Sequence, residues 1–377
     1  MIAFNQTQSP GCREEDGLWR WTSPVPRLWS TLLSAACHLP LPVRKLVYEN
    51  LYEQACDIAS QHFFDVTRLK TDDWRKRHGK LRRPISCEAE LNQSISLMLD
   101  SLNDPHTRLI EREQTKKNGT SYPEAVQSSL LDGSIGYLRL RHFQTEALAN
   151  RVAAHLHRLR QARALILDLR HNPGGSLMEA VDVAALFLKD GKIVSLKVRS
   201  GGSSEKPHYI NCTYALTPQL RKTETSCSCN PGAPRVTYEK REQYMADNRP
   251  LIVLVDHETA SSAELLTGAL KDNGAAIVLG SQSYGKGVGQ DLLPLWNGTQ
   301  IRLTTFQFRT PGGFWPGDGT GATNQGIVAD ITVQDTGGEA GGCDDKQLQA
   351  AIARLNRGSD HYVDAALVAL GRTLQFR

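Results

Sequence analysis

A serine pair, Ser261 and Ser262, stands between an apolar run and an amphipathic stretch of the chain. The run Leu251–Val255 predicts a buried strand, and residues 262–273 predict a helix. The two hydroxyls would therefore lie at the carboxyl end of a strand, where open α/β sheets place their sites. The free N–H groups at the start of the helix could stabilise an oxyanion there. The simpler interpretation of such a serine is a helix cap.

Lys286 lies between two glycines in the segment 283–290, which reads SYGKGVGQ. This segment follows the next apolar run, 276–279, so its loop should emerge at the same sheet edge as the serines. A desolvated lysine loses its proton near neutral pH and can accept the proton of a serine hydroxyl. Gln290 could orient the amine through its side-chain oxygen. The alternatives are a surface lysine in a glycine-rich turn and a phosphate loop, but the Walker spacing is absent.

The segment 168–175 reads DLRHNPGG and also joins an apolar run to a predicted helix. Its adjacent glycines, Gly174 and Gly175, expose backbone N–H groups suited to an oxyanion hole, which the amide of Ser262 would complete. A plain strand–helix turn is the alternative. None of the three segments calls for a metal ion or an organic cofactor, and we expect neither.

Together the three segments resemble the tail-specific, or C-terminal processing, peptidases. In that family's S-A-S-A-S-E pattern, the middle serine lies three residues before the glutamate and 25 before the lysine of F-G-K-G-x-x-Q. Counting back from Glu264 and from Lys286 leads to Ser261 in both cases. The resemblance thus selects Ser261 over Ser262 as the nucleophile, with Lys286 as the general base and Gln290 as the residue that orients it.

Further matching segments extend the resemblance to about residues 45–335: Asp104–Leu109, Gly268–Asp272, Leu303–Thr305, Thr310–Gly313 and Gly326–Ile331. The chain departs from the family pattern in the TASSA order of residues 259–263 and in Ala329, which replaces a proline. Only about 25 residues separate Leu109 from Ile135, too few for the PDZ domain that many members carry. The resemblance therefore implies a member without a PDZ domain.

The resemblance implies an α/β fold with a crotonase-like, Clp-protease-like core, in which helices flank a mainly parallel sheet. It implies a serine endopeptidase that hydrolyses peptide bonds of unstructured polypeptides, near their C-termini. The amides of Ser262 and of Gly174 or Gly175 would hold the oxyanion. The rival hypothesis is a catalytically silent binding protein of the same fold, for a hydrophobic ligand or a peptide; its nucleophile or lysine should be lost, yet both are present.

A Ser–His–Asp triad is a second alternative. His142, His171 and His257 lie near predicted strand ends or close to Ser261, with Asp168 or Asp256 as the possible third member. No G-x-S-x-G nucleophile elbow occurs, however, and lone histidines at strand ends are more often structural or exposed. The Ser–Lys pair is therefore the preferred hypothesis.

The elements that must position these residues alternate between strands and helices beyond Gly133, which favours a largely parallel sheet with helices packed on it. We predict strands at 135–143, 165–169, 193–198, 251–255, 276–279 and 300–310, and helices at 145–159, capped by Thr145, 177–188 and 262–273. The expected regions are an irregular or targeting-like segment 1–44, a helical region 45–110, a core 130–340 with an inserted lid or substrate-contacting loop at about 199–249, and a helical tail 341–377.

Composition limits the other possibilities. The 377 residues are 40% hydrophobic and 22% charged, as in a soluble globular protein, and the net charge of +4 is too weak and too dispersed to argue for a nucleic-acid partner. The sequence contains no run of 18 apolar residues, so it predicts no membrane-spanning helix. Residues 27–37 resemble a weak export signal, with a surface helix as the alternative, so we expect an exported, periplasmic protein and keep the cytoplasm as the alternative. The oligomeric state stays open.

The eight cysteines include one closely spaced pair, Cys227 and Cys229. The C-x-C spacing, with no paired histidines after it, argues against a zinc site. In an exported protein, Cys212 could form a disulfide with either member of the pair.

Overall fold

The computed structural model forms two compact units. The first comprises residues 1–120, 199–208 and 290–305, and the second comprises residues 121–198, 209–289 and 306–377. The residues that the structure describes are 12–15, 18–21, 40–70, 74–78, 85–111, 124–131, 134–321, 323, 325–334, 341 and 344–357. The signal-like segment 27–37 and most of the predicted tail lie outside them. No helix in the described ranges is long and apolar enough to cross a membrane.

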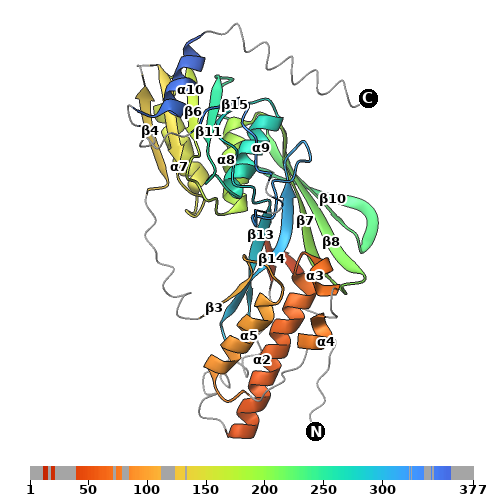
Figure 1. Cartoon of the computed structure of the whole chain (residues 1–377). Helices are drawn as coiled ribbons and strands as arrows, with labels where there is room; N and C mark the ends of the chain where they lie inside the picture. Colours follow the sequence, from red (N-terminus) through yellow and green to blue (C-terminus); the bar gives the residue numbers. More distant parts are fainter. Residues whose placement is uncertain are drawn as a thin grey trace. The chain divides into compact units, whose positions relative to one another are not determined.

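The first unit is built on helices that share one apolar core (Figure 1). Leu51, Leu91 and Ile95 are fully buried in it. The buried guanidinium of Arg199 donates hydrogen bonds to the carbonyl oxygens of Phe63 (2.6 Å) and Ser60 (2.8 Å). These bonds fix the segment 199–208 to the end of the unit's first long helix. The helices are α2 (Leu41–His62), α3 (Val66–Lys70), α4 (Trp74–His78) and α5 (Glu88–Asp100).

The second unit contains a six-stranded sheet in the order β15-β12-β11-β6-β5-β4. All its pairings are parallel except that of β4 with β5. The central strands β6 and β11 are buried along their whole length, as expected of strands covered on both faces. The strands are β4 (Val126–Leu131), β5 (Ile135–Leu140), β6 (Ala164–Asp168), β11 (Leu251–Val255), β12 (Ile277–Gly280) and β15 (Ile331–Thr332).

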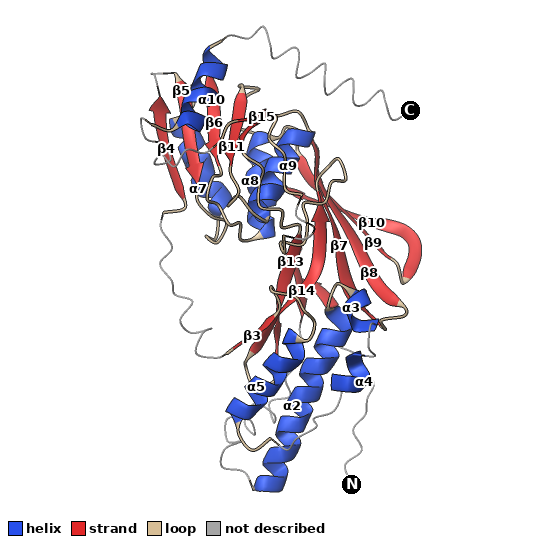
Figure 2. Cartoon of the chain, in the orientation of Figure 1, coloured by secondary structure: helices blue, strands red, loops and turns tan. Residues whose placement is uncertain are grey.

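Helices cover both faces of this sheet (Figure 2). Because successive side chains of a strand point to opposite faces, Leu165 and Leu167 of β6 pack in the core with three helices, whereas Ala164 and Ile166 pack in the core with α10. The helices are α7 (Leu148–Arg158), α8 (Leu177–Phe187) and α9 (Ser262–Asp272) on the first face and α10 (Lys346–Asn356) on the second.

A second sheet is antiparallel and runs in the order β10-β9-β8-β7-β14-β13, with β3 also paired to β14. The expectation of a mainly parallel sheet therefore fits only one of the two large sheets. The strands of the antiparallel sheet are β3 (Arg108–Ile110), β7 (Gly191–Gly202), β8 (Pro207–Leu216), β9 (Leu220–Cys227), β10 (Asn230–Lys240), β13 (Val288–Pro294) and β14 (Gln300–Arg309). A separate hairpin pairs β1 (Cys12–Glu15) with β2 (Leu18–Trp21).

The polar stretch at about 199–249 supplies β8, β9 and β10, which Figure 2 shows as long, curved strands. Short turns join them, and tight turns allow only antiparallel pairing. The disulfide considered for Cys212 is not formed, because Cys227 and Cys229 bond to each other. Cys212 is buried on β8 opposite Thr225.

The start of α7 differs from its prediction. The helix begins at Leu148 rather than directly after Thr145. The backbone N–H groups of Ala147 and Leu148 donate to the carboxylate of Glu179, at 3.0 and 2.9 Å, so a side chain of α8 satisfies them. Ser176 in turn caps α8 by accepting from the N–H of Glu179.

Candidate active site

Ser261 lies at the junction of β11 and α9, in an unusual backbone conformation. Its φ is 57° and its ψ is −118°, values that a residue with a side chain rarely adopts. Such strain persists only where the surroundings over-determine the geometry, and it is concentrated at functional sites. The half-buried Ser261 is therefore held in place by its neighbours rather than by its own preference.

The loop before Ser261 is fixed to the loop that follows β6. The hydroxyl of the fully buried Thr259 donates to the carbonyl of Leu169 at 2.9 Å. The N–H of Ala260 donates to the carbonyl of Asn172, also at 2.9 Å. Two of the three segments that the sequence singled out are thus bonded to each other.

The third segment, around Lys286, is tied to Ser261 through the carboxylate of Glu264. Its Oε2 atom accepts the N–H of Ser261 and the N–H of Lys286, both at 2.8 Å. Its Oε1 atom accepts the N–H of Gly285 at 2.7 Å and the hydroxyl of Ser283 at 2.6 Å. One side chain therefore fixes the backbone of both residues of the predicted Ser–Lys pair.

Glu264 has no exposed surface. Burial raises the pKa of its carboxyl group above the ordinary value, while the hydrogen bonds from Ser283, Lys286, Ser261 and Gly285 act in the opposite direction. In the sequence, Glu264 served only as a point from which to count the spacing, and its hydrogen bonds to the two backbones were not predicted. A glutamate three residues after a serine at a helix start is the capping-box pattern, which could have suggested the bond to the Ser261 N–H.

The glycines of the segment 168–175 pack against the serine pair. A Cβ atom built on Gly174 would lie 2.9 Å from Cβ of Ser261 and 2.8 Å from N of Ser262. The φ of Gly174 is 89°, a value that also favours glycine. The hydroxyl of Ser262 donates to the carbonyl of Gly175 at 2.9 Å, so Gly174 packs against Ser261 and Gly175 is bonded to its neighbour, Ser262.

The two predicted glycine donors differ in their partners. The N–H of Gly174 donates to Oδ1 of Asn172 at 2.9 Å. Within the described part of the chain, no protein acceptor takes the N–H of Gly175 or that of Ser262. Ser262 follows Ser261 in the chain, and its hydroxyl is bonded to the carbonyl of Gly175. The free N–H of Gly175 therefore makes it a better candidate than Gly174 as the partner of the Ser262 N–H.

The pattern of Peptidase family S41 matches residues 134–333, more than half of the chain, and includes all three segments. The chain belongs to peptidase family S41. The resemblance found in the sequence is thereby confirmed at the level of the family.

Curated relatives of this S41 member carry processing-protease names. A carboxyl-terminal-processing protease of Synechocystis is 36% identical over 180 residues, 47% of this chain and 34% of the relative. A carboxy-terminal-processing protease of Bartonella bacilliformis is 30% identical over 210 residues, with 54% and 40% covered. The chloroplastic carboxyl-terminal-processing peptidase 2 of Arabidopsis thaliana is 32% identical over 212 residues, with 55% and 35% covered. The chain thus spans well under half the length of these relatives.

Solved structures show the same fold at low sequence identity. The photosystem II D1 C-terminal processing protease aligns with a TM-score of 0.54 and 17% identity, covering 76% of this chain and 93% of that one. A lipoprotein from Streptococcus agalactiae aligns with a TM-score of 0.58 and 14% identity, covering 82% and 96%. The S41 protease fold therefore combines the parallel and antiparallel sheets described above.

Gln290 of this S41 member belongs to the first unit, whereas Ser261 and Lys286 belong to the second. Its Nε2 atom donates to the hydroxyl of Thr304 at 3.1 Å, and its Oε1 atom accepts from Arg302 at 3.3 Å. Its predicted role toward Lys286 stays a prediction.

The histidines of the alternative triad have other partners. The ring of His171, 41% exposed, lies 3.0 Å from the carboxylates of both Asp256 and Glu258. His257 is 72% exposed. Among the described residues, no histidine hydrogen-bonds to Ser261.

Asp168, the other candidate third member of a triad, lies in a buried network. Its carboxylate accepts the hydroxyl of Tyr137 at 2.6 Å and forms an ion pair with Arg170. Arg170 also pairs with Asp345, the residue that caps α10, so this network joins the end of β6 to that helix. The carboxylates of Asp168 and Asp345 raise the pKa of the Arg170 guanidinium, although burial acts in the opposite direction. Asp168 is therefore bonded to Tyr137 and Arg170 and, among the residues that the structure describes, not to a histidine.

Proposed function

We propose that this chain is a serine endopeptidase that cleaves unstructured polypeptides near their C-termini, with Ser261 as the nucleophile and Lys286 as the general base. The observation that carries the proposal is the shared Glu264 carboxylate, which binds the backbone N–H of both residues through one oxygen. The names of the curated relatives support the same reaction and substrate end.

The chemistry assigns one role to each group. Neutral Lys286 takes the proton of the Ser261 hydroxyl as Oγ attacks the carbonyl carbon of the substrate. The N–H groups of Ser262 and Gly175 donate to the oxyanion that forms. Lys286 then gives its proton to the leaving amine, and a water molecule, activated in the same way, hydrolyses the acyl-enzyme. Gln290 orients the lysine amine.

The same scheme predicts how activity depends on pH. The general base works only in its neutral form, so cleavage should become faster as pH rises and Lys286 loses its proton. A profile that is flat from about pH 5 to 9 would count against a lysine base.

The kinetic test uses an unstructured peptide with a label near its C-terminus. Ser261→Ala and Lys286→Ala should each lower kcat/KM by roughly 10³-fold or more, because each removes a group that acts on the reacting atoms. Ser262→Ala is the matched control, since it keeps the backbone N–H and should retain most of the activity. Unchanged cleavage in either of the first two variants would contradict the Ser–Lys assignment. Peptide binding by a wild-type protein that cleaves none of a varied peptide set would favour the silent binding protein.

The proposal also covers the peptidase core, the location of the protein and its partners. We assign the peptidase core, of the crotonase-like, Clp-protease-like type, to residues 130–340, with β8–β10 as its insertion in place of a loop. We place the protein outside the cytoplasm, a location supported by the export-signal-like residues 27–37 of the sequence. Its partners are polypeptide substrates rather than nucleic acids.

A further inference from the structure

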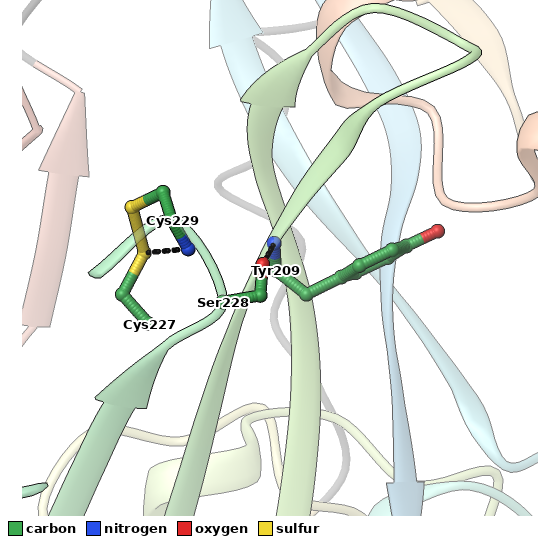
Figure 3. Close-up of a disulfide and its surroundings, with 4 residues drawn as sticks. All are labelled: Tyr209, Cys227, Ser228 and Cys229. Atoms are coloured by element: carbon green, nitrogen blue, oxygen red, sulfur yellow. Dashed lines mark hydrogen bonds between the residues drawn. A yellow bond between two sulfur atoms is a disulfide. The ribbon is translucent and has the colours of Figure 1, made fainter. Parts of the chain in front are cut away.

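Cys227 and Cys229 are bonded across a single residue, Ser228, at the turn between β9 and β10 (Figure 3). Cys229 is exposed and Cys227 is half-buried. A thiolate attacks a disulfide only where it can reach one of the sulfurs, so the exposure of Cys229 makes this bond open to small thiols.

The turn keeps its shape through contacts that do not involve sulfur. The N–H of Ser228 donates to the carbonyl of Tyr209 on β8, and the N–H of Tyr209 donates to the hydroxyl of Ser228, both at 2.8 Å (Figure 3). The ammonium group of Lys197 lies 4.2 Å from the centre of the Tyr209 ring. A bond that closes so short a loop also constrains the unfolded chain little. Its removal should therefore leave the turn in place.

One backbone group prepares the bond for opening. The N–H of Cys229 donates to Sγ of Cys227 at 3.2 Å, the contact drawn as a dashed line in Figure 3. When the bond is cleaved by attack on Cys229, negative charge develops on Sγ of Cys227. A hydrogen bond to the charged form stabilises a thiolate, so Cys227 is the better leaving sulfur.

The other described thiol on this sheet, Cys212, does not compete with the pair for the reductant. Cys212 is buried on β8, and burial keeps a thiol inert toward external reagents. Strand β9 pairs Cys227 with Ile210 and Thr225 with Cys212, so the bonded pair and the buried thiol lie at different levels of the ladder. The pair can thus open and close without exchanging partners within the sheet.

We propose that Cys227–Cys229 is a reversible thiol–disulfide exchange site for small thiol reductants. A reductant thiolate attacks Sγ of Cys229, the S–S bond breaks, and Cys227 leaves as a thiolate that takes up a proton. A second reductant thiolate attacks the reductant sulfur of the mixed disulfide and releases Cys229. The protein gains two electrons and two protons, and two reductant thiols become one disulfide. This inference is independent of the peptidase reaction.

The test uses glutathione redox buffers and the folded full-length chain. Trypsin cleavage after Lys222 and Arg235 releases a peptide, 223–235, that contains Cys227 and Cys229 and no other cysteine. After acid quenching and maleimide capture of free thiols, the mass of this peptide reports the redox state of the pair. The disulfide form should dominate in oxidised glutathione, and the reduced form should increase in a single reversible transition as reduced glutathione is added.

Two variants and one quench sharpen the result. Cys227→Ser and Cys229→Ser should each accumulate a lasting glutathione adduct at the remaining cysteine, whereas the wild-type pair should expel it. In early quenched samples of the wild type, glutathione should be attached to Cys229 and maleimide to Cys227. Circular dichroism checks that the variants are folded.

Three outcomes would overturn the inference. The first is a pair that resists reduced glutathione while folded and is reduced only after unfolding, as structural disulfides with low potentials are. The second is a peptide that carries two free thiols in every buffer. The third is a peptide joined to another cysteine of the chain.

Discussion

The loops around Ser261 and the turn between β9 and β10 belong to the same unit but are held together in opposite ways. The loops depend on buried side chains, above all Glu264 and Thr259, each with no exposed surface and each bonded to backbone groups of other segments. The turn between β9 and β10 depends on backbone pairing and one exposed residue, Ser228. Substitutions should therefore be costly in the loops and tolerated at the turn.

The largest effect that separates the two regions is expected at Glu264. Each carboxylate oxygen of Glu264 accepts two hydrogen bonds, whereas an amide offers one acceptor oxygen. Glu264→Gln therefore leaves two buried donors without an acceptor, each at a cost of about 1–3 kcal/mol. We expect kcat/KM to fall by about a hundredfold, mainly through kcat, because the positions of both Ser261 and Lys286 change.

The matched control for this substitution is Glu258→Gln, in the same loop but with a side chain that is 58% exposed. It should change kcat/KM by less than about threefold, since exposed substitutions seldom cost more than about 0.5 kcal/mol. Peptide cleavage assays on both variants, with circular dichroism, make the measurement. Equal losses in the two variants would contradict the positioning role of Glu264.

A smaller effect is expected at Gly174. An added methyl group would press on Cβ of Ser261, 2.9 Å away, and the φ of 89° would be strained. Gly174→Ala should lower the free energy of unfolding by about 1–3 kcal/mol and kcat/KM by roughly tenfold. Gly313→Ala is the control, because its φ of 86° carries the same strain but nothing lies within 4 Å of the new methyl group. If both variants lose the same activity, the contact with Ser261 does not matter.

The smallest effect is expected at the turn. Replacing both Cys227 and Cys229 by serine should change the free energy of unfolding by less than about 1 kcal/mol and leave peptide cleavage unchanged, because the ladder and Ser228 hold the turn. Arg221→Ala, which removes the ion pairs of β9 with Asp182 on α8 and Glu239 on β10, should cost more. Denaturant unfolding of the two proteins makes the comparison. A larger loss in the double serine variant would show that the bond is a structural staple.

The elements predicted most accurately from the sequence are those that the local pattern of residues determines. The apolar run Leu251–Val255 is strand β11 with the predicted bounds, and α9 begins at Ser262 as expected. The helix cap by Glu179 was missed because it comes from a residue about 30 positions away, and propensity carries no information on such contacts. The strands β8–β10 were taken for an inserted loop because polar residues and glycines hide the alternation that marks a strand.

The sequence proposed members for the candidate site but gave no information on how they are connected. Comparison with the family pattern singled out Ser261 and Lys286 as candidates, and the glycine pair pointed to candidate N–H donors. The distinction between Gly174 and Gly175 needed the structure, because it depends on whether Asn172 already accepts one of the two N–H groups. The fourfold role of Glu264 likewise depends on two loops meeting in space.

The most direct test of the central claim is to identify the residue that becomes covalently modified. The wild-type protein and the variants are treated with a fluorophosphonate, and the adduct is located by peptide mass spectrometry. We predict a single adduct on Ser261 that is lost in Lys286→Ala and retained in Ser262→Ala. An adduct on Ser262, or equal labelling of Ser261 with and without Lys286, would contradict the Ser261–Lys286 assignment.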